Sequence, residues 1–496
     1  MERREYSTIW SSKYLKSASL AVLLAALGYV PIASRSPIRD ADVWWHLRVG
    51  QWILANGEFP HSGIFSRTAA DRPWAAYSWG YEILLAKFYA WFGITGIAWF
   101  GVLMVIGAAL VFFWALHRVS NRFWISYALC AVGGLACLYN VLPRPVFFSM
   151  MFFAVVLVLL HEANVSGRSN ALWLLPLVFA LWANFHIQFI YGLIVVGVIT
   201  LINAAQQLLG ERLPKRLLRL HSTPPVRLSV FAWAASLLAC CIGPYSYHLY
   251  GVVLSYAKSK FPYEYLQEFQ PIDFKHPSDY FLAAITISAI IAVVRKKHAD
   301  ITSLAVLAIG TALAWRGVRD AWFLAISAGI TVADAYRSER SERGTTKAQV
   351  APGFIACVLL ASSLFVIAER THFTERELDR AISSEYPVDA VNFLRRNPFR
   401  GPIYNDFGWG GFLIWYMPDH PVSIDGRTDL YGDDMDLMNL KTVSGDYESD
   451  PYFRESGIVL LPINAPLCRR LLQDERFRLV YQNGISMVFV RNRPSE

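Results

Sequence analysis

Long apolar segments separated by short basic loops constrain this chain more than any other feature. A bilayer-spanning helix needs roughly 20 mostly apolar residues, and about eleven segments approach that length. Charged residues make up only 17% of the 496 residues, whereas ordinary soluble domains carry about 25%. The sequence therefore predicts an α-helical polytopic membrane protein. The predicted spans are 17–34, 93–116, 123–141, 145–162, 171–187, 189–208, 228–244, 280–294, 301–316, 320–336 and 350–368.

Basic residues in the connecting loops indicate the orientation. If the N-terminus is cytoplasmic, nearly every short cytoplasmic loop is basic, which is the positive-inside pattern. These loops carry Arg3, Arg4, Lys13, Lys16, Arg118, Arg122, Arg168, Arg212, Lys215, Arg216, Arg219, Arg227, Arg295, Lys296, Lys297, Arg337, Arg340, Arg343 and Lys347. The net charge of +8 is then mostly a topology signal. No nucleic-acid partner is expected, because the basic residues form no single stripe.

The same topology predicts two domains. Residues 1–369 form the transmembrane domain, and residues 370–496 form a small α/β domain on the outer side. The first outer loop, 34–92, is expected to carry two interfacial helices, near 44–56 and 77–92. A second outer loop, 244–279, is too long to be a mere connector and is expected to act as a lid. In the outer domain the predicted strands are 402–405, 412–416, 421–424, 457–461, 477–481 and 486–490, and the predicted helices are 387–396 and 465–474.

An ionisable motif follows the first apolar segment directly. Asp40-Ala-Asp42-Val-Trp-Trp-His46-Leu-Arg48 places two carboxylates, a histidine and an arginine at the edge of the membrane. Charge there is costly, so it is a functional-site hypothesis by default. Two carboxylates one residue apart also repel each other unless a cation or a partner relieves them. The alternative is a set of ordinary interface charges beside an aromatic belt.

Other polar residues fall at the same outer level of the predicted topology. Transfer from a lipid-phosphate donor fits them, because a carboxylate can act as general base and arginines can hold a departing phosphate. Asp40 and Asp42 could instead hold a divalent cation, Mg²⁺ or Mn²⁺. The arginines could also simply snorkel or pair with Asp320, and the histidine could belong to the core. The proposed phosphate binders are Arg144, Arg316 and Arg319, and the proposed sugar or acceptor contacts are Asn184, His186, Tyr245, Glu264 and Glu268.

The first outer loop carries a family resemblance. Asp42-Val-Trp-Trp-His-Leu-Arg-Val-Gly, Gly57-Glu-Phe-Pro60, Phe65-Ser66 and Pro73-Trp74 resemble bacterial relatives of the protein mannosyltransferases (glycosyltransferase family 39), within the GT-C superfamily of membrane glycosyltransferases. The resemblance implies a polyprenyl-phosphate sugar as donor and Asp42 as the catalytic base. Asp40 would be a helper or metal ligand, and His46 would complete the catalytic group. Gly63 stands where many relatives carry an aspartate.

A second stretch lies in the outer domain. Phe407-Gly-Trp-Gly-Gly-Phe-Leu-Ile-Trp415, followed by Asp425-Gly-Arg427, is similar to the Trp-Trp-Asp-Tyr-Gly region of oligosaccharyltransferase catalytic subunits, although the central Trp-Asp pair is missing. Trp409, Asn405, Asp425 and Arg427 are candidates for an acceptor groove. The alternative reading of Trp409 to Gly411 is a tight turn between strands.

The sequence thus predicts a GT-C glycosyltransferase of the bacterial inner membrane, with a cytoplasmic N-terminus and a periplasmic C-terminal domain. It would move a sugar from polyprenyl phosphate to an extracytoplasmic glycan, lipid or protein. One alternative is a transporter or flippase for a lipid-linked saccharide, but the ionisable residues cluster at one face rather than along a path. Another is a non-catalytic scaffold of the cell envelope, which the glycine at position 63 keeps open.

Overall fold

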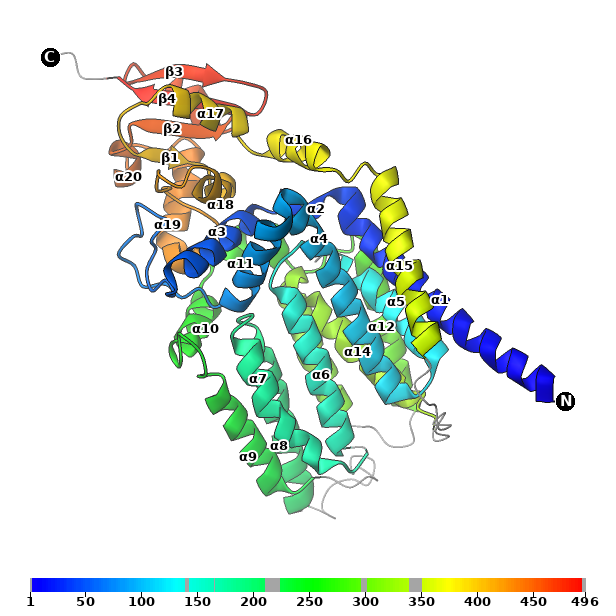
Figure 1. Ribbon diagram of the computed structural model, residues 1–496. Coiled ribbons are helices and arrows are strands. Elements are labelled where there is room, and N and C mark those ends of the chain that lie inside the picture. Colours follow the sequence, from blue (N-terminus) through cyan, green and yellow to red (C-terminus); the bar gives the residue numbers. More distant parts are fainter. Residues whose placement is uncertain are drawn as a thin grey trace. The chain divides into compact units, whose positions relative to one another are not determined.

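Two compact units make up the chain (Figure 1). The computed structural model describes residues 2–138, 142–164, 166–209, 224–295, 301–338 and 350–492. Unit 1 comprises Met1–Ser34, Gly101–Tyr247 and Gln267–His372, and unit 2 comprises Arg35–Phe100, His248–Leu266 and Phe373–Glu496. The predicted basic loops at 210–223, 296–300 and 339–349 lie outside the described residues, as do the side chains of Arg3 and Arg4.

Unit 1 is built of helices. The predicted spans fall on helices of the described residues, but the predicted span 171–187 is divided between two short helices, Ser169–Leu174 and Leu175–Ala183. Within the described residues, six helices are long and apolar enough to cross a membrane: Lys13–Ser34, Trp79–Ser120, Val146–Asn164, Phe189–Leu209, Pro277–Arg295 and Pro352–Arg370. The chain is therefore a multi-pass membrane protein, and the larger span number remains a prediction. The elements are α1 (Glu2–Ser34), the second part of α4 (Trp79–Ser120), α5 (Phe123–Ala136), α6 (Val146–Asn164), η2 (Ser169–Leu174), α7 (Leu175–Ala183), α8 (Phe189–Leu209), α9 (Val226–Ala239), η4 (Gln267–Phe269), α12 (Pro277–Arg295), α13 (Ile301–Arg316), η5 (Val318–Asp320), α14 (Ala321–Ala335) and α15 (Val350–Arg370).

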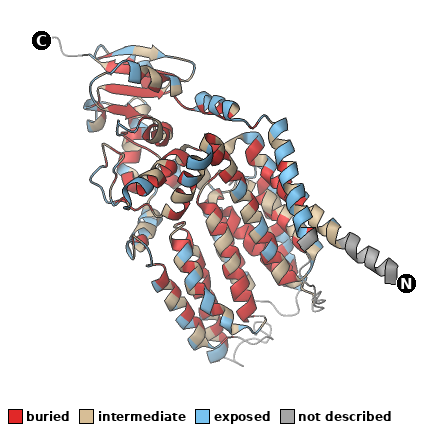
Figure 2. Cartoon of the chain, viewed as in Figure 1, coloured by how far each residue is buried: buried red, intermediate tan, exposed pale blue. Residues whose placement is uncertain are grey.

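Burial differs strongly between the helices of unit 1 (Figure 2). In the most apolar window of α6, 78% of the residues are buried, whereas the corresponding value for α15 is 11%. Helix α6 contacts α7, α8 and α14, so it lies in the core of this unit. Helix α15 packs along α1 and exposes Phe354, Phe365 and Val366. Such apolar exposure suits a helix that faces lipid.

Helix α4 bends at a glycine where the sequence predicts a change of role. Gly93 has φ 60° and ψ −145°, a left-handed conformation that only glycine adopts without strain. The bend separates Trp79 to Phe92 from the rest of α4, close to the predicted boundary between an interfacial helix and a span. Trp91 and Phe92 are exposed just before it, as expected of interfacial aromatics.

Unit 2 combines a mixed four-stranded sheet with short helices. The strand order is β1-β2-β4-β3, with β1 and β2 parallel and the other pairs antiparallel. The β3–β4 hairpin turns at Asn483 and Gly484, as predicted. The first outer loop belongs to this unit together with the C-terminal segment. Its elements are α2 (Ser36–Arg39), α3 (Ala41–Asn56), the first part of α4, α10 (His248–Lys258), α11 (Phe261–Tyr265), α16 (Glu375–Glu385), α17 (Val388–Arg396), β1 (Ile403–Asn405), α18 (Phe407–Tyr416), α19 (Thr428–Val443), α20 (Pro451–Arg454), β2 (Ile458–Pro462), α21 (Pro466–Leu471), β3 (Phe477–Gln482) and β4 (Ser486–Arg491).

Two strand predictions and the tight turn are wrong. Residues 412–416 belong to helix α18, which Asp406 caps by accepting a hydrogen bond from the Gly408 amide at 2.8 Å. The helix is apolar nearly all round because it packs against α3. Two glycines allow other segments to approach this helix closely. A Cβ at Gly411 would lie 2.4 Å from the carbonyl oxygen of Ala41, the first residue of α3, and a Cβ at Gly410 would lie 2.0 Å from the Ile424 carbonyl oxygen. Residues 421–424 form only an isolated bridge, between Ser66 and Val422.

Candidate functional site

The ionisable motif of the first outer loop lies at the start of helix α3. Asp40 is the N-cap residue, and its Oδ1 accepts from the Asp42 amide at 3.3 Å. The half-buried Asp42 accepts from Trp45 Nε1 at 3.1 Å through its own Oδ1. A Cβ at Gly426 would lie 2.2 Å from that same oxygen. Only glycine at position 426 lets the 425–427 segment approach this carboxylate so closely, so Asp42 is held in a fixed position.

One turn further along α3, a buried histidine meets a buried carboxylate. His46 Nδ1 lies 2.9 Å from Glu82 Oε1, and the two residues are 5% and 1% exposed. The second oxygen, Glu82 Oε2, has no hydrogen-bond partner among the described residues. Gly50 makes this pairing feasible, because a Cβ there would lie 2.0 Å from the Glu82 carbonyl oxygen. Sequence reasoning missed Glu82, although a lone carboxylate at the start of an aromatic helix was a usable signal.

The predicted acceptor residues Asp425 and Arg427 form a buried ion pair. The Arg427 guanidinium donates from Nε and Nη2 to the two carboxylate oxygens, both at 2.7 Å, and the Tyr431 hydroxyl donates to Oδ2 at 2.7 Å. Burial alone would lower the pKa of Arg427, but the charge and hydrogen bonds of Asp425 outweigh it and raise that pKa. The guanidinium also stacks over the Trp74 ring at 4.6 Å. Direct contact with an acceptor would require this pair to open.

Asp429, which sequence reasoning also missed, lies beside a cavity of unit 2. Trp74 Nε1 donates to its Oδ2 at 3.1 Å, and the Tyr256 hydroxyl donates to its Oδ1 at 3.2 Å. Burial raises its pKa to about 6, against the opposing effect of Arg427. The cavity of about 280 Å³ is also lined by Arg72 and Lys258, so donors and acceptors both face it. Such a lining suits a ligand with many hydroxyl groups.

In unit 1, two of the predicted phosphate binders share one carboxylate. Glu268 pairs with Arg144 in a very short contact and with Arg319 Nη1 at 3.2 Å. Burial would raise the pKa of Glu268, but the two arginines outweigh it and lower that pKa. The cluster carries two positive charges against one negative charge. It therefore has the net charge and the donor groups to bind an anion such as phosphate.

The neighbouring Asp320 anchors the turn that carries Arg319. Its Oδ1 accepts from Gln188 Nε2 at 2.7 Å, and its Oδ2 accepts from the Tyr191 hydroxyl at 2.8 Å. The Val318 amide bonds the Gln270 carbonyl oxygen at 2.9 Å, which ties this turn to the segment of Glu268. Asp320 is thus held by hydrogen bonds from Gln188 and Tyr191, and it also interacts electrostatically with Arg319 and Arg316, in line with the pairing considered from the sequence.

His186 and Asn184 act within the polar core of unit 1. Trp182 Nε1 donates to Ser149 Oγ at 2.7 Å, and the Ser149 hydroxyl shares a second hydrogen bond with His186 Nδ1, also at 2.7 Å. Asn184 Nδ2 donates to the Ile242 carbonyl oxygen at 2.6 Å, and Gly243 passes against its side chain.

The remaining predicted contacts are dispersed. Tyr245 is buried, Glu264 is exposed near the end of the short helix α11, and Arg316 ends α13. In unit 2, Trp409 Nε1 donates to the Glu385 carbonyl oxygen at 3.1 Å.

The expected divalent cation has no assembled ligand set in the described part of the chain. No group of three or more histidine, cysteine, aspartate or glutamate side chains is placed there to hold a metal ion. Asp40 caps its helix, and Asp42 accepts from an indole. Mg²⁺ is often held by only one or two carboxylates with water in its other positions, so a divalent cation on Asp40 and Asp42 stays a prediction.

Comparisons with known proteins agree on the fold alone. No protein-family model and no curated protein sequence matches the chain. The oligosaccharyltransferase AglB of Archaeoglobus fulgidus, in complex with an inhibitory peptide and a dolichol-phosphate, superposes with a TM-score of 0.56 at 10% identity over 93% of this chain and 71% of its own. The apo form of the Archaeoglobus fulgidus oligosaccharyltransferase gives 0.54 at 11% identity over 90% and 69%. ArnT of Cupriavidus metallidurans bound to undecaprenyl phosphate gives 0.48 at 14% identity over 94% and 97%. The chain is thus similar in fold, over most of its length, to the archaeal oligosaccharyltransferase, in line with the resemblance of the first outer loop.

Proposed function

We propose that this protein is a glycosyltransferase that takes a sugar from a polyprenyl-phosphate donor and passes it to an extracytoplasmic acceptor. The observation that carries the proposal is the Asp42 carboxylate, fixed by Trp45 and by the close approach of Gly426. A base must be positioned before its pKa matters. The fold supports the donor class, since the archaeal relative binds dolichol-phosphate, which is a polyprenyl phosphate.

In the proposed reaction Asp42 accepts the proton of an acceptor hydroxyl group. The acceptor oxygen forms a bond to C1 of the sugar while the bond from C1 to the phosphate oxygen breaks. The electron pair leaves with the polyprenyl phosphate, whose negative charge increases. Arg144 and Arg319 would stabilise that charge, because guanidinium groups bind phosphate oxygens with directed hydrogen bonds.

The membrane placement is part of the proposal. Basic loops favour a cytoplasmic N-terminus, a periplasmic C-terminal domain and a bacterial inner membrane. His46 would act through its bond to Glu82, as a positioning group for the same turn of α3 that carries Asp42. Asp40 would hold the first turn of that helix in place as its cap.

The test measures transfer of label from a panel of radiolabelled polyprenyl-phosphate sugars to extracytoplasmic acceptors. Purified wild type, Asp42→Asn and Asp71→Asn are compared with and without EDTA. Asp71 is an exposed carboxylate of the same loop and is the matched control. Transfer should be lost in Asp42→Asn, by a factor of about 100 or more, and kept in Asp71→Asn. Full activity in folded Asp42→Asn would overturn the assignment of the base.

The EDTA arm decides the metal question separately. Loss of activity that Mg²⁺ or Mn²⁺ restores would show that transfer needs a divalent cation, for which Asp40 and Asp42 are the candidate ligands. If no donor is turned over but a lipid-linked saccharide binds tightly, the flippase or scaffold alternatives replace the enzyme.

A further inference from the structure

Three segments that lie far apart in the sequence line the cavity beside Asp429 in unit 2. Arg72 comes from the first outer loop, Lys258 ends helix α10, and Asp429 lies in the first turn of α19. The cavity volume of about 280 Å³ lies just below the roughly 300–1,000 Å³ of pockets that hold drug-sized ligands. The cavity therefore suits a ligand about as large as one sugar unit.

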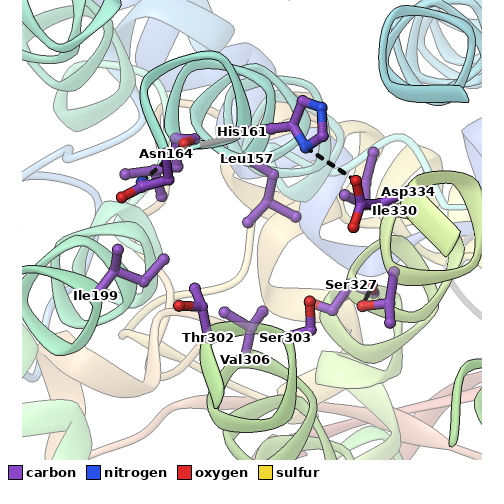
Figure 3. A pocket seen from close by; sticks show the side chains of 12 residues that line it. Leu157, His161, Asn164, Ile199, Thr302, Ser303, Val306, Ser327, Ile330 and Asp334 are labelled. Carbon is purple, nitrogen blue, oxygen red and sulfur yellow. Dashed lines mark hydrogen bonds and ion pairs between the residues drawn. The ribbon is translucent and has the colours of Figure 1, made fainter. Parts of the chain in front are cut away.

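Unit 1 contains a smaller cavity, of about 60 Å³, between α6, α8, α13 and α14 (Figure 3). Its carboxylate, Asp334, already pairs with His161, whose Nδ1 lies 3.6 Å from Asp334 Oδ1. Leu157, Val306 and Ile330 contribute apolar surface to the same cavity. The volume admits only a few water molecules, so this cavity lacks the room for a sugar.

Two indole rings connect the unit 2 cavity to the proposed base. Trp45 Nε1 donates to Asp42 Oδ1 at 3.1 Å, and the Trp45 and Trp74 ring centroids lie 6.2 Å apart. Trp74 Nε1 in turn donates to Asp429 Oδ2 at 3.1 Å. These short steps hold the two carboxylates at a fixed separation, which a short glycan chain is long enough to bridge.

The cavity lining offers both hydrogen-bond acceptors and hydrogen-bond donors. Trp74 and Tyr256 occupy two of the roughly four lone pairs on the Asp429 carboxylate, so this group can still accept from a ligand hydroxyl group. Arg72 uses Nη1 to donate to the Tyr431 carbonyl oxygen, and a guanidinium group has further N–H donors for a ligand. The Tyr256 ring adds an apolar surface, which the C–H groups of a sugar ring can cover.

We propose that the acceptor is a glycan and that the unit 2 cavity binds one of its uncharged sugar units. The inference rests on the proposed function and names the acceptor class that the function leaves open. Two basic side chains, Arg72 and Lys258, line the cavity together with three carboxylates, Asp429, Asp433 and Asp434. Positive and negative groups are thus nearly balanced, which favours a neutral sugar over a phosphate or a strongly charged ligand. In the proposed complex one sugar hydroxyl group donates to Asp429, and another sugar oxygen accepts from Arg72.

The test measures binding of glycans to the purified full chain without a donor, in a detergent that has no sugar headgroup. The probes are radiolabelled neutral disaccharides and trisaccharides of mannose, glucose, galactose or arabinose, used in equilibrium dialysis, and at least one should bind saturably. Ser255 is exposed on α10 and lines the cavity, so a bulky side chain there would fill it. Ser255→Trp should therefore weaken binding about tenfold or more. Leu254→Trp is the matched control, since Leu254 is 59% exposed on the same helix and lies outside the lining.

A second variant, Asp429→Asn, should weaken the same binding severalfold by removing a charged acceptor. Equal binding in wild type and Ser255→Trp, or no saturable binding of any probe, overturns the inference even if the protein transfers sugar to a peptide or a lipid. Saturable binding that Ser255→Trp abolishes, without transfer from any donor, keeps the glycan site and overturns the proposed transferase. With a donor present, Ser255→Trp should raise the KM for the glycan acceptor and change kcat much less.

Discussion

Arg427 and Asp425 hold each other in a two-point ion pair with no exposed side-chain surface on either residue. Such a pair gains little over two well-packed apolar residues, because removing both charges from water costs about as much as their attraction returns. Its effect appears when one partner is lost and the other charge stays buried alone. The loop that carries Gly426 against Asp42 therefore depends on both residues.

Replacing one partner should destabilise unit 2 strongly. We expect Arg427→Met to lower the free energy of unfolding by about 3–5 kcal/mol, since Asp425 would keep a buried charge without its main partner. The double variant Arg427→Met/Asp425→Leu should recover a large part of that loss. Thermal unfolding of both variants measures the effect, and additive losses in the double variant would contradict it.

The stability of unit 2 should depend on pH because Asp436 is buried. Neither of its carboxylate oxygens has a hydrogen-bond partner among the described residues. Burial, with added repulsion from Asp425, Asp433 and Asp429, raises the pKa of Asp436 to about 8 against the attraction of Arg72. The folded protein therefore binds this proton more tightly than the unfolded chain does. The stability contribution is complete below about pH 4 and is lost as the pH rises through about 8.

Asp436→Asn removes this proton linkage. We expect the variant to differ much less from wild type in Tm at pH 5 than at pH 9. At pH 9 the variant should have the higher Tm, because ionisation of the buried Asp436 costs wild type on the order of 5 kcal/mol of stability there. Asp434→Asn, an exposed neighbour on α19, is the control and should follow wild type at both pH values. A variant that is destabilised equally at pH 5 and pH 9 would show that Asp436 is ionised and partnered.

The close approach of α3 and α4 predicts opposite effects for two glycines. A Cβ at position 50 would lie 2.0 Å from the Glu82 carbonyl oxygen, whereas a Cβ at Gly251 in α10 would meet nothing within 4 Å. Gly50→Ala should therefore cost about 2 kcal/mol or more by forcing the helices apart. Gly251→Ala should be neutral or stabilise by up to about 1 kcal/mol, since alanine favours helix. Similar Tm changes in both variants would contradict the contact.

The apolar helices and the hairpin could be predicted because local patterns determine them. Apolar length fixes a membrane helix, and Asn483-Gly484 fixes a tight turn, whatever the rest of the chain does. Helix α18 could not be predicted in this way, because Phe412 to Tyr416 has the composition of a strand. Its helical state depends on the Asp406 cap and on packing against α3, which is remote in sequence.

The residues of the candidate site show the same contrast between local patterns and long-range contacts. The motif of Asp40, Asp42 and His46 was visible because charge beside an apolar segment is unusual. Glu82 and Asp429 were missed because their importance comes from long-range partners, His46 for one and Trp74 and Tyr256 for the other. The sequence alone does not indicate that Glu82 or Asp429 has these partners.

Under the proposed function, the sharing of Glu268 by Arg144 and Arg319 predicts how a donor phosphate would bind. The carboxylate occupies the guanidinium groups that a phosphate would need, so it should compete with the donor. Glu268→Gln should therefore bind undecaprenyl phosphate about tenfold more tightly. Arg144→Gln and Arg319→Gln should each bind it at least about tenfold more weakly, since one charge-assisted hydrogen bond contributes about 1.5–3 kcal/mol.

Quenching of tryptophan fluorescence by added undecaprenyl phosphate measures these affinities. Arg118→Gln is the control, because Arg118 pairs with Glu162 at 3.1 Å in the same unit and has no proposed role in donor binding. The pKa of Glu268 lies below its usual range, so the advantage of Glu268→Gln should persist across neutral pH. If Glu268→Gln weakens binding as much as the arginine variants do, the carboxylate instead positions the guanidinium groups for phosphate.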